Sequence, residues 1–207
     1  MNDFRVISFY TVDTPYEEVM NTYLLPSLKK FDIPYKIAAI KSEGDWVRNV
    51  ALKPELIAKE LHESPENLVF LDADCVLRRY PQLLHEIPLE FDLGLFYLSW
   101  KKWYRRLDTD YEELVSSCMF LRNNEAVRDL VDEWAKRAKE TRVWEQKVLE
   151  DLLKERDMNV FKFPDGFNYI GTLPDGSAPY WENRVSDPVI EQIQISRKLK
   201  NPGRNNG

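Results

Sequence analysis

Apolar residues follow two different spacings along the chain, and these spacings predict the order of its secondary-structure elements. Short runs of Val, Ile, Leu and Phe are typical of strands that are buried on both faces. Apolar residues that recur every three or four positions mark the buried face of a helix. We therefore predict strands at 5–12, 35–40, 68–71, 91–98, 114–121, 160–163 and 189–195, and helices at 15–30, 54–62, 82–86, 125–140 and from 142 onwards.

Prolines set the expected helix boundaries. Thr14-Pro15-Tyr16-Glu17 is a capping box with proline at the first helical position, so a helix is expected to start there. Pro26 lies inside the apolar pattern that follows and is expected to kink or split that helix. The next helix is expected only from Pro54, and residues 43–49 are expected to form a loop that carries an aromatic residue and a cation.

The predicted elements alternate strand, helix, strand, helix, strand within the first 77 residues. This alternation favours right-handed crossovers between parallel strands. The expected fold class is therefore α/β, with a Rossmann-type, mainly parallel central sheet flanked by helices, and strands 5–12 and 68–71 should end at the same edge. A chain of 207 residues suits a single domain. We place this domain at residues 1–200 and a disordered tail at 201–207.

Two acidic residues follow the short apolar strand at 68–71. In an extended backbone, Asp72 and Asp74 would point to one face of the sheet, roughly 6.5–7 Å apart. Carboxylates beyond the carboxyl end of a buried strand are well placed to hold a hard cation such as Mg²⁺ or Mn²⁺. The alternative is that Asp72 ends the strand by accepting hydrogen bonds from backbone amides and that Asp74 is merely solvated.

The charge distribution bears on the choice of partner. A formal net charge of −6 argues against general nucleic-acid binding. One stretch, Trp100-Lys101-Lys102-Trp103-Tyr104-Arg105-Arg106, nevertheless interleaves four cations with three aromatic residues. Such a stretch can grip phosphates, sugars or single-stranded nucleic acid. It can equally form a mobile flap or a solvated turn with its aromatic residues tucked under it.

Other features bear on location. No apolar run approaches the roughly 18 residues of a membrane helix, and the first residues show no signal peptide. Cys75 and Cys118 lie in apolar runs, so reduced, buried thiols are expected. We therefore expect a cytoplasmic protein without a membrane span. His62 and His85 lie in separate stretches, which argues against a histidine-based metal site or a Ser-His-Asp triad.

The order of these segments resembles a GT-A glycosyltransferase, the fold of many nucleotide-sugar-dependent transferases. The segments that carry the likeness are Val6–Thr11, Trp46–Ile57, Phe70–Asp74, Ser116–Asn123, Trp144–Gln146 and Phe163–Tyr169, which follow the family's order. The resemblance implies a metal-dependent transferase that moves a sugar from a nucleotide-sugar, with a UDP-sugar as the expected donor, to a hydroxyl group. The acceptor is open: a sugar, a protein or, through Lys101–Arg106, DNA.

The resemblance also implies how the donor is bound. The implied donor-binding positions are Tyr10, Thr11 and Val12 for the base and ribose, Arg48, Lys53, Arg197 and Lys198 for the phosphates, and Asp72 with Ala73 for the ribose or metal. Asp72 and Asp74 would ligate Mn²⁺ or Mg²⁺ at the diphosphate, where the metal stabilises the charge of the leaving group and acts as the acid catalyst. Alternatively, Tyr10 is a core residue and Lys53 is a helix-entry charge.

The implied acceptor site comes from later segments. Its positions are Ser116, Ser117, Trp144, Gln146, Asn168 and Tyr169. Glu145 is the implied catalytic carboxylate beside Asp74. In an inverting enzyme Glu145 would deprotonate the acceptor hydroxyl, and in a retaining enzyme it would orient the acceptor. Alternatively, Glu145 only caps a helix, because a carboxylate is stabilised at a helix start.

The sequence departs from the family pattern near its C-terminus. Many GT-A enzymes place a histidine there as a third metal ligand, but residues 190–198 contain none. Candidate substitutes are Gln192 or Gln194, as weak ligands through an amide oxygen, and Glu191; alternatively, the site holds a metal only when the donor is bound. The missing histidine keeps open a non-catalytic relative that only binds a sugar or nucleotide. A haloacid-dehalogenase-type phosphatase also uses Asp-x-Asp, but that family continues with Gly-Thr where this chain has Cys75-Val76.

Overall fold

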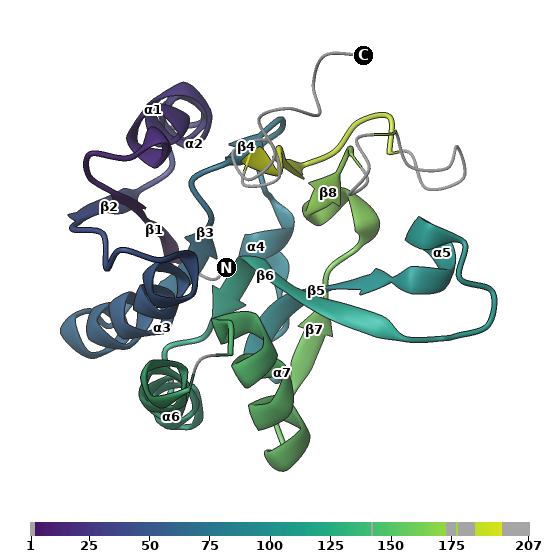
Figure 1. Ribbon diagram of the computed structural model, residues 1–207. Helices are drawn as coiled ribbons and strands as arrows, with labels where there is room; N and C mark the ends of the chain where they lie inside the picture. Colours follow the sequence, from purple (N-terminus) through teal and green to yellow (C-terminus); the bar gives the residue numbers. More distant parts are fainter. Residues whose placement is uncertain (1–2, 142, 173–176, 178–184, 196–207) are drawn as a thin grey trace.

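The computed structural model describes residues 3–141, 143–172, 177 and 185–195 (Figure 1). Its elements are β1 (Phe4–Thr11), α1 (Pro15–Thr22), α2 (Leu24–Lys30), β2 (Tyr35–Ile40), α3 (Trp46–Glu63), β3 (Asn67–Leu71), β4 (Cys75–Leu77), α4 (Leu83–Glu86), β5 (Leu93–Ser99), α5 (Trp100–Tyr104), β6 (Glu112–Leu121), α6 (Glu125–Glu140), α7 (Glu145–Glu155), β7 (Val160–Lys162), a 3₁₀ turn (Asp165–Phe167), β8 (Tyr169–Ile170) and β9 (Ile190–Gln192). None of the helices in these ranges is long and apolar enough to cross a membrane. The tail predicted at 201–207 lies outside the described residues.

A six-stranded sheet forms the centre of the fold, in the order β2-β1-β3-β6-β5-β7. Strand β1 lies parallel to β2 and β3, and β5 lies parallel to β7, whereas β6 runs antiparallel to its neighbours β3 and β5. Five of these six strands therefore run in one direction, which confirms the predicted mainly parallel α/β sheet. As predicted, β1 and β3 end at the same edge.

Both faces of this sheet are covered, as Figure 1 shows. Successive residues of a strand point to opposite faces. Ile7 and Phe70 accordingly belong to an apolar cluster with residues of α3, α6 and α7. Val6 and Val69 belong to a second cluster with residues of α1, α2 and the C-terminal segments. Burial on both sides explains why these strands read as continuous apolar runs rather than as alternating patterns.

The prediction of a loop at 43–49 is wrong, because helix α3 already begins at Trp46. Asp45 caps this helix, and its side chain accepts a hydrogen bond from the Arg48 N–H at 2.9 Å. Pro54 lies inside the helix rather than at its start. The proline removes one backbone hydrogen bond, but the apolar face of α3 is buried against α6 and the central sheet, and this burial outweighs the loss.

Pro26 has the predicted effect. Helix α1 ends at Thr22 and α2 begins at Leu24, so the helix predicted at 15–30 is divided. Pro26 then lies in the first turn of α2, where a missing N–H leaves no intrahelical bond unmade. Thr14 caps α1, and its side chain accepts a hydrogen bond from the Tyr16 N–H at 3.3 Å.

A second sheet, in the order β4-β9-β8, lies beyond the end of β3. Its central strand β9 is shorter than the strand predicted at 189–195, and no spacing in the sequence predicts β4, β8 or helix α5. Pairing of β9 with β4 brings Gln192 opposite Cys75. This pairing carries the C-terminal segment to the Asp-x-Asp turn. Cys75 and Cys118 are buried, free thiols, as predicted.

Candidate active site

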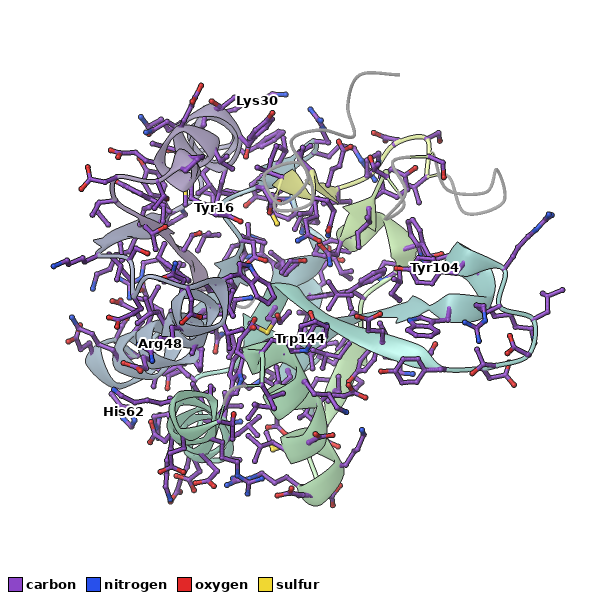
Figure 2. The ribbon with its side chains drawn as sticks, viewed as in Figure 1. Tyr16, Lys30, Arg48, His62, Tyr104 and Trp144 are labelled. Carbon is purple, nitrogen blue, oxygen red and sulfur yellow. The ribbon has the colours of Figure 1, made fainter. Side chains whose placement is uncertain are left out.

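A cavity of about 380 Å³ opens at the edge where β1 and β3 end. Its walls come from these strand ends, from helices α1, α3 and α5, from β6, and from the start of α7. In Figure 2 the labelled Tyr16, Tyr104 and Trp144 come from α1, α5 and the residue before α7, and all three line the cavity. The cavity therefore collects segments from most of the chain at the edge of the sheet where α/β proteins bind their ligands.

Asp72 and Asp74 both line this cavity, but they are not in an extended strand. Strand β3 ends at Leu71, and the Cys75 N–H donates to the Asp72 carbonyl at 2.9 Å, which closes a turn. The expected extended spacing is therefore wrong, because the chain turns here to form β4. The alternative of a solvated Asp74 is also wrong: the residue is 6% exposed, and its Oδ2 accepts a hydrogen bond from the Ile195 N–H at 2.8 Å.

Lys53, Asp72, Ser116 and Glu145 form a group that we call the inner charge cluster. The Lys53 Nζ lies 2.7 Å from Glu145 Oε1 and 3.2 Å from Asp72 Oδ1, and it donates to Ser116 Oγ at 3.0 Å. The Ser116 hydroxyl donates in turn to Glu145 Oε1 at 2.8 Å. Lys53 is 3% exposed and Glu145 is 4% exposed. Lys53 is therefore not a solvated helix-entry charge, because the residue lies in the middle of α3 and its ammonium is buried. Glu145 is not only a helix cap, because the side chains of Lys53 and Ser116 bind its carboxylate.

Electrostatics inside the cavity keeps Lys53 charged and disfavours ionised aspartates. Burial by itself lowers the pKa of Lys53, but Asp72 and Glu145 outweigh burial, so the pKa is raised and the ammonium persists. Burial and the neighbouring Asp72 raise the pKa of Asp74 to about 6. Burial also raises the pKa of Asp72, against the opposing effect of Lys53. Burial and both aspartates raise the pKa of Tyr16 to about 12. A cation between the two carboxylates would relieve this repulsion.

The donor set for a metal is limited. Among the residues that the structure describes, no group of three or more His, Cys, Asp and Glu side chains is placed to hold one ion. Gln192 and Gln194 line the cavity, and the Gln194 amide donates to Gln192 Oε1 at 2.6 Å. Glu191 instead pairs with Arg78 at 2.6 Å. The oxygen ligands that remain in the wall for a hard cation are the two carboxylates, Asp72 and Asp74, and the neighbouring glutamine amide oxygens.

The other predicted donor-binding residues are divided. Tyr10, Thr11 and Ala73 line the cavity. Val12 is not among its lining residues, and its N–H donates to Ile40 at 2.8 Å. Arg48 is also outside the lining, with a 63% exposed side chain paired with Asp45. Arg197 and Lys198 lie outside the described residues.

The predicted acceptor residues are also divided. Ser116, Ser117, Trp144 and Gln146 line the cavity together with Glu145. Asn168 is fully buried behind the wall, where its Oδ1 accepts a hydrogen bond from the Ser117 hydroxyl at 3.0 Å. The ring of Tyr169 packs against Trp103 with centroids 5.9 Å apart. Neither Asn168 nor Tyr169 is among the lining residues.

Several lining residues escape the sequence reasoning. The missed residues Trp46, Asn49 and Val50 line the cavity from one face of α3, together with Lys53, a predicted donor-binding residue. Their spacing of three, four and seven residues is a helical signal, which the loop interpretation of 43–49 hides. The rings of Trp46 and Trp144 meet edge-on with centroids 6.2 Å apart.

Glu113 also escapes, and it is part of a second group. Glu113 Oε2 accepts a hydrogen bond from the Trp100 indole at 2.9 Å, and Oε1 accepts one from the Gln146 amide at 3.3 Å. We call Trp100, Glu113 and Gln146 the outer cluster. The Gln146 Oε1 accepts from the Ser116 N–H at 3.2 Å, which links the two clusters.

The basic aromatic stretch at 100–106 has its own partners. Lys101 pairs with Asp110 at 3.0 Å, Lys102 pairs with Asp165, and Arg106 pairs with Asp108 at 3.1 Å. Trp103 is 1% exposed. Helix α5 therefore tucks an aromatic residue under it and pairs three of the stretch's cations with acids.

Comparisons with known proteins point to the fold. No family model and no curated protein matches the sequence. A solved glycosyltransferase involved in the glycosylation of the major capsid of PBCV-1 is 13% identical, with a TM-score of 0.68 over 98% of both chains. The apo WbbM bifunctional glycosyltransferase is 10% identical, with a TM-score of 0.60 over 93% of this chain and 46% of that chain.

A third solved structure extends the likeness. Apo mouse xyloside xylosyltransferase 1 is 10% identical, with a TM-score of 0.53 over 95% of this chain and 99% of that chain. At these identities the likeness speaks for the fold. The chain has the GT-A-like glycosyltransferase fold, as the resemblance in its sequence predicts.

Proposed function

We propose that this protein is a divalent-metal-dependent glycosyltransferase that transfers a sugar from a nucleotide-sugar, with a UDP-sugar as the first candidate, to an acceptor hydroxyl. One observation carries the proposal. Asp74 lines a single cavity with the inner charge cluster, at the sheet edge where α/β proteins bind ligands. The fold itself is shared with solved glycosyltransferases.

The donor would lie along the ends of β1 and β3. Tyr10 and Thr11 are in position to contact the base and ribose, since both line the cavity there. Lys53 is already bound by Asp72 and Glu145, so its role is to hold these carboxylates in place rather than to be the main phosphate ligand. Arg197 and Lys198 remain predicted phosphate contacts.

Asp72 and Asp74 would hold Mn²⁺ or Mg²⁺, with the Gln192 amide oxygen as the candidate third ligand. A divalent ion supplies positive charge to the diphosphate as it leaves. The raised pKa of Asp74 supports this role, because burial and the charge of Asp72 make its ionised form unfavourable without a cation.

Transfer breaks the bond between the anomeric carbon and the diphosphate oxygen, and the electron pair leaves with the nucleoside diphosphate. The acceptor oxygen forms the new bond to the anomeric carbon and loses its proton. Glu145 is the candidate proton acceptor in an inverting reaction, and the departing diphosphate is the acceptor in a retaining one. NMR of the product's anomeric configuration distinguishes the two routes.

The location and the acceptor extend the proposal. Two buried free thiols, Cys75 and Cys118, support a cytoplasmic location, where thiols stay reduced. One structural neighbour takes part in glycosylating a viral capsid and another is a xyloside xylosyltransferase. Acceptors therefore differ among proteins of this fold, and they must be read from the cavity itself.

Thermal unfolding of the wild type and Asp74→Asn with a panel of nucleotide-sugars, each with and without Mn²⁺, tests the proposal. A ligand at about 100 times its Kd stabilises the folded state by roughly 2.7 kcal/mol. We expect one UDP-sugar to raise the unfolding temperature of the wild type only with metal, and Asp74→Asn to abolish the shift. The control variant is Asp110→Asn, whose carboxylate is 90% exposed and pairs with Lys101.

A metal-dependent shift without transfer to any acceptor would favour the second candidate, a non-catalytic nucleotide-sugar binder. The limited donor set among the described residues is the observation behind this candidate. If no nucleotide-sugar shifts the wild type with any metal, the transferase proposal is wrong.

A further inference from the structure

The acceptor is not specified by the proposed function, but the cavity has a side that no donor role uses. Leu98, Tyr104, Glu113, Trp144 and Gln146 line it, and they come from the end of β5, from α5, from the start of β6 and from the start of α7. Helix α5, on this outer side, lies across the molecule from β1 and β2 in Figure 1, whereas Trp144 reaches Trp46 at the start of α3. The chemistry of these side chains therefore bears on the acceptor.

Glu113 is the central polar group of this outer side. Both of its oxygens are positioned by neutral donors, the Trp100 indole at 2.9 Å and the Gln146 amide at 3.3 Å. Among the described residues, no Lys or Arg pairs with it, and the side chain is half-buried. Each carboxylate oxygen can accept about two hydrogen bonds. Glu113 thus presents two fixed, negatively charged acceptor positions that neutral neighbours leave available.

Two neighbouring acceptor positions match a pair of adjacent hydroxyl groups. Hydrogen bonds from hydroxyls to a carboxylate are charge-assisted and strong. A serine or threonine of a protein offers one hydroxyl, whereas a pyranose offers several on adjacent carbons. The carboxylate of Glu113 therefore favours a sugar over a peptide.

Aromatic side chains supply the apolar half of the same surface. Trp144 is 46% exposed, and Trp46 meets it edge-on at 6.2 Å. Tyr104 lines the cavity from α5. The face of an aromatic ring carries partial negative charge, so it attracts the C–H groups on one face of a sugar ring. A sugar ring has a face of C–H groups and an edge of hydroxyl groups. The aromatic rings suit the C–H face, and the fixed carboxylate suits the hydroxyl edge.

The charges disfavour an anionic acceptor. Glu113 lines the cavity and is held by neutral donors, so its charge would repel a polyanion at short range. Lys101 and Arg106 do not compensate, because they pair with Asp110 and Asp108 outside the cavity. Lys53 lines the cavity but is already bound by the carboxylates of the inner charge cluster. Deoxyribose phosphates would therefore find carboxylates in the cavity and paired cations outside it.

We infer that the acceptor is an uncharged sugar unit, bound with adjacent hydroxyls on Glu113 and with its C–H face on Trp144. This inference rests on the proposed function, since it names the class of molecule that receives the sugar. It adds Glu113, which contacts the acceptor, to the residues of the site.

Saturation-transfer NMR tests the inference with the full chain in the presence of UDP and Mg²⁺. The probes are the methyl glycosides of glucose, galactose, xylose and N-acetylglucosamine, with an oligothymidylate and a Ser/Thr-containing peptide as competing classes. We expect saturable binding of at least one glycoside. Glu113→Gln should weaken it roughly 10- to 100-fold, the value of a hydrogen bond to a charged group, and Trp144→Ala should weaken it as well.

Matched controls exist for both variants. Glu112 neighbours Glu113 but is exposed and bonded to Lys162 at 2.6 Å, so Glu112→Gln should bind like the wild type. Val143 is 46% exposed and outside the cavity lining, so Val143→Ala is the control for Trp144→Ala. Because Trp144 is so exposed, its variant should fold even if Glu113→Gln does not.

Three results overturn the inference: a glycoside that binds wild type, Glu113→Gln and Trp144→Ala equally, binding of only the oligonucleotide or the peptide, and no glycoside binding at all. Failure of the proposed function is separate, since it is judged by the metal-dependent shift with nucleotide-sugars. A chain that binds a glycoside through Glu113 but no nucleotide-sugar would lose the proposed function and keep the sugar site.

Discussion

The inner charge cluster and the outer cluster each place a glutamate in the same cavity, but they treat its charge in opposite ways. Glu145 is 4% exposed and lies 2.7 Å from the ammonium of Lys53. Glu113 is half-buried and is held by an indole and an amide. The partners set how much charge each carboxylate keeps: Lys53 offsets the charge of Glu145, whereas Glu113 is held by neutral donors and keeps its charge for a ligand.

Burial explains the difference. A fully buried carboxylate without a counter-ion costs several kcal/mol, so Glu145 needs Lys53. Glu113 keeps contact with water and needs no cation. The inner charge cluster still carries two carboxylates for one ammonium, and Asp74 lies beside it. That remaining negative charge is what a divalent cation would offset.

The largest expected effect comes from removing the counter-ion of the inner charge cluster. Lys53→Met should destabilise the protein by about 3–5 kcal/mol, because it leaves the buried carboxylate of Glu145 without its cation and also removes the cation beside the partly exposed Asp72. Urea unfolding measures the loss. The control is Lys59→Met on the same helix, whose exposed ammonium lies 3.9 Å from Glu63 and should change stability by less than about 0.5 kcal/mol.

A double variant sharpens this result. Lys53→Met with Glu145→Gln removes one stranded charge together with the cation, so part of the lost stability should return, with a coupling of about 1–3 kcal/mol. If Lys53→Met unfolds at the wild-type urea concentration, the buried pair has no structural role and the contrast between the two clusters is lost.

Asp74 should produce the next largest effect, in protein kept metal-free with a chelator. Its folded-state pKa of about 6 lies above the ordinary value of 3.8, so the folded state binds the proton more tightly. The stability gained from this proton is present at about pH 4 and is lost as the pH rises through about 6.

The Asp74→Asn variant tests that sign. It lacks the titrating carboxyl, so at about pH 7.5 it should be more stable than the wild type by about 2 kcal/mol, and the gap should shrink toward about pH 4. Urea unfolding across this pH range measures the gap, with Asp110→Asn as the control that should show none. A wild type that is the more stable protein at about pH 7.5 would contradict the prediction.

The outer cluster should tolerate substitution far better. Glu113→Gln should cost only about 1 kcal/mol of stability, because the half-buried side chain keeps one oxygen for one of its two neutral donors and loses a single hydrogen bond at a site that water reaches. Chemical unfolding beside Lys53→Met gives a direct comparison. A loss as large as that of Lys53→Met would mean that Glu113 is a structural residue and not an available one.

The smallest effect is expected outside both clusters. Lys101→Ala and Arg106→Ala each break one exposed ion pair, so each should change stability by less than about 0.5–1 kcal/mol. Glycoside binding should be unchanged, since neither residue lines the cavity. If these variants lost acceptor binding at low salt, the acceptor site would include the 100–106 stretch, and an anionic acceptor would be favoured.

Local periodicity was enough for much of the fold. The strand at 68–71, the helix at 125–140, the division of 15–30 at its proline and the mainly parallel sheet all follow from the spacing of apolar residues and from chain order. Part of the cavity follows too, because β1 and β3 end together and carry Thr11, Asp72 and Asp74. These features depend on residues that are close together in the sequence and on the general right-handedness of crossovers, so they need no knowledge of distant contacts.

The contacts that set the chemistry are not local. Lys53 meets Ser116 across 63 positions, and Asp74 meets the Ile195 N–H across 121. Pro54 hides the helix face that carries Lys53, because a proline usually marks a helix start and not its interior. Only packing of α3 on the sheet decides that the helix continues through it.

For this protein, the sequence by itself determined the order of the main strands and helices, the mainly parallel sheet and the common edge where β1 and β3 end, because apolar spacing and chain order are local properties. The tertiary structure alone decided which of two adjacent glutamates pairs with a lysine and which lines the cavity. Glu112 and Glu113 are adjacent and alike in sequence, yet one bonds Lys162 and the other lines the cavity. The register of β6 on β5, with its irregularity at Leu95/Phe96, sets that choice, and strand register depends on pairing between distant segments.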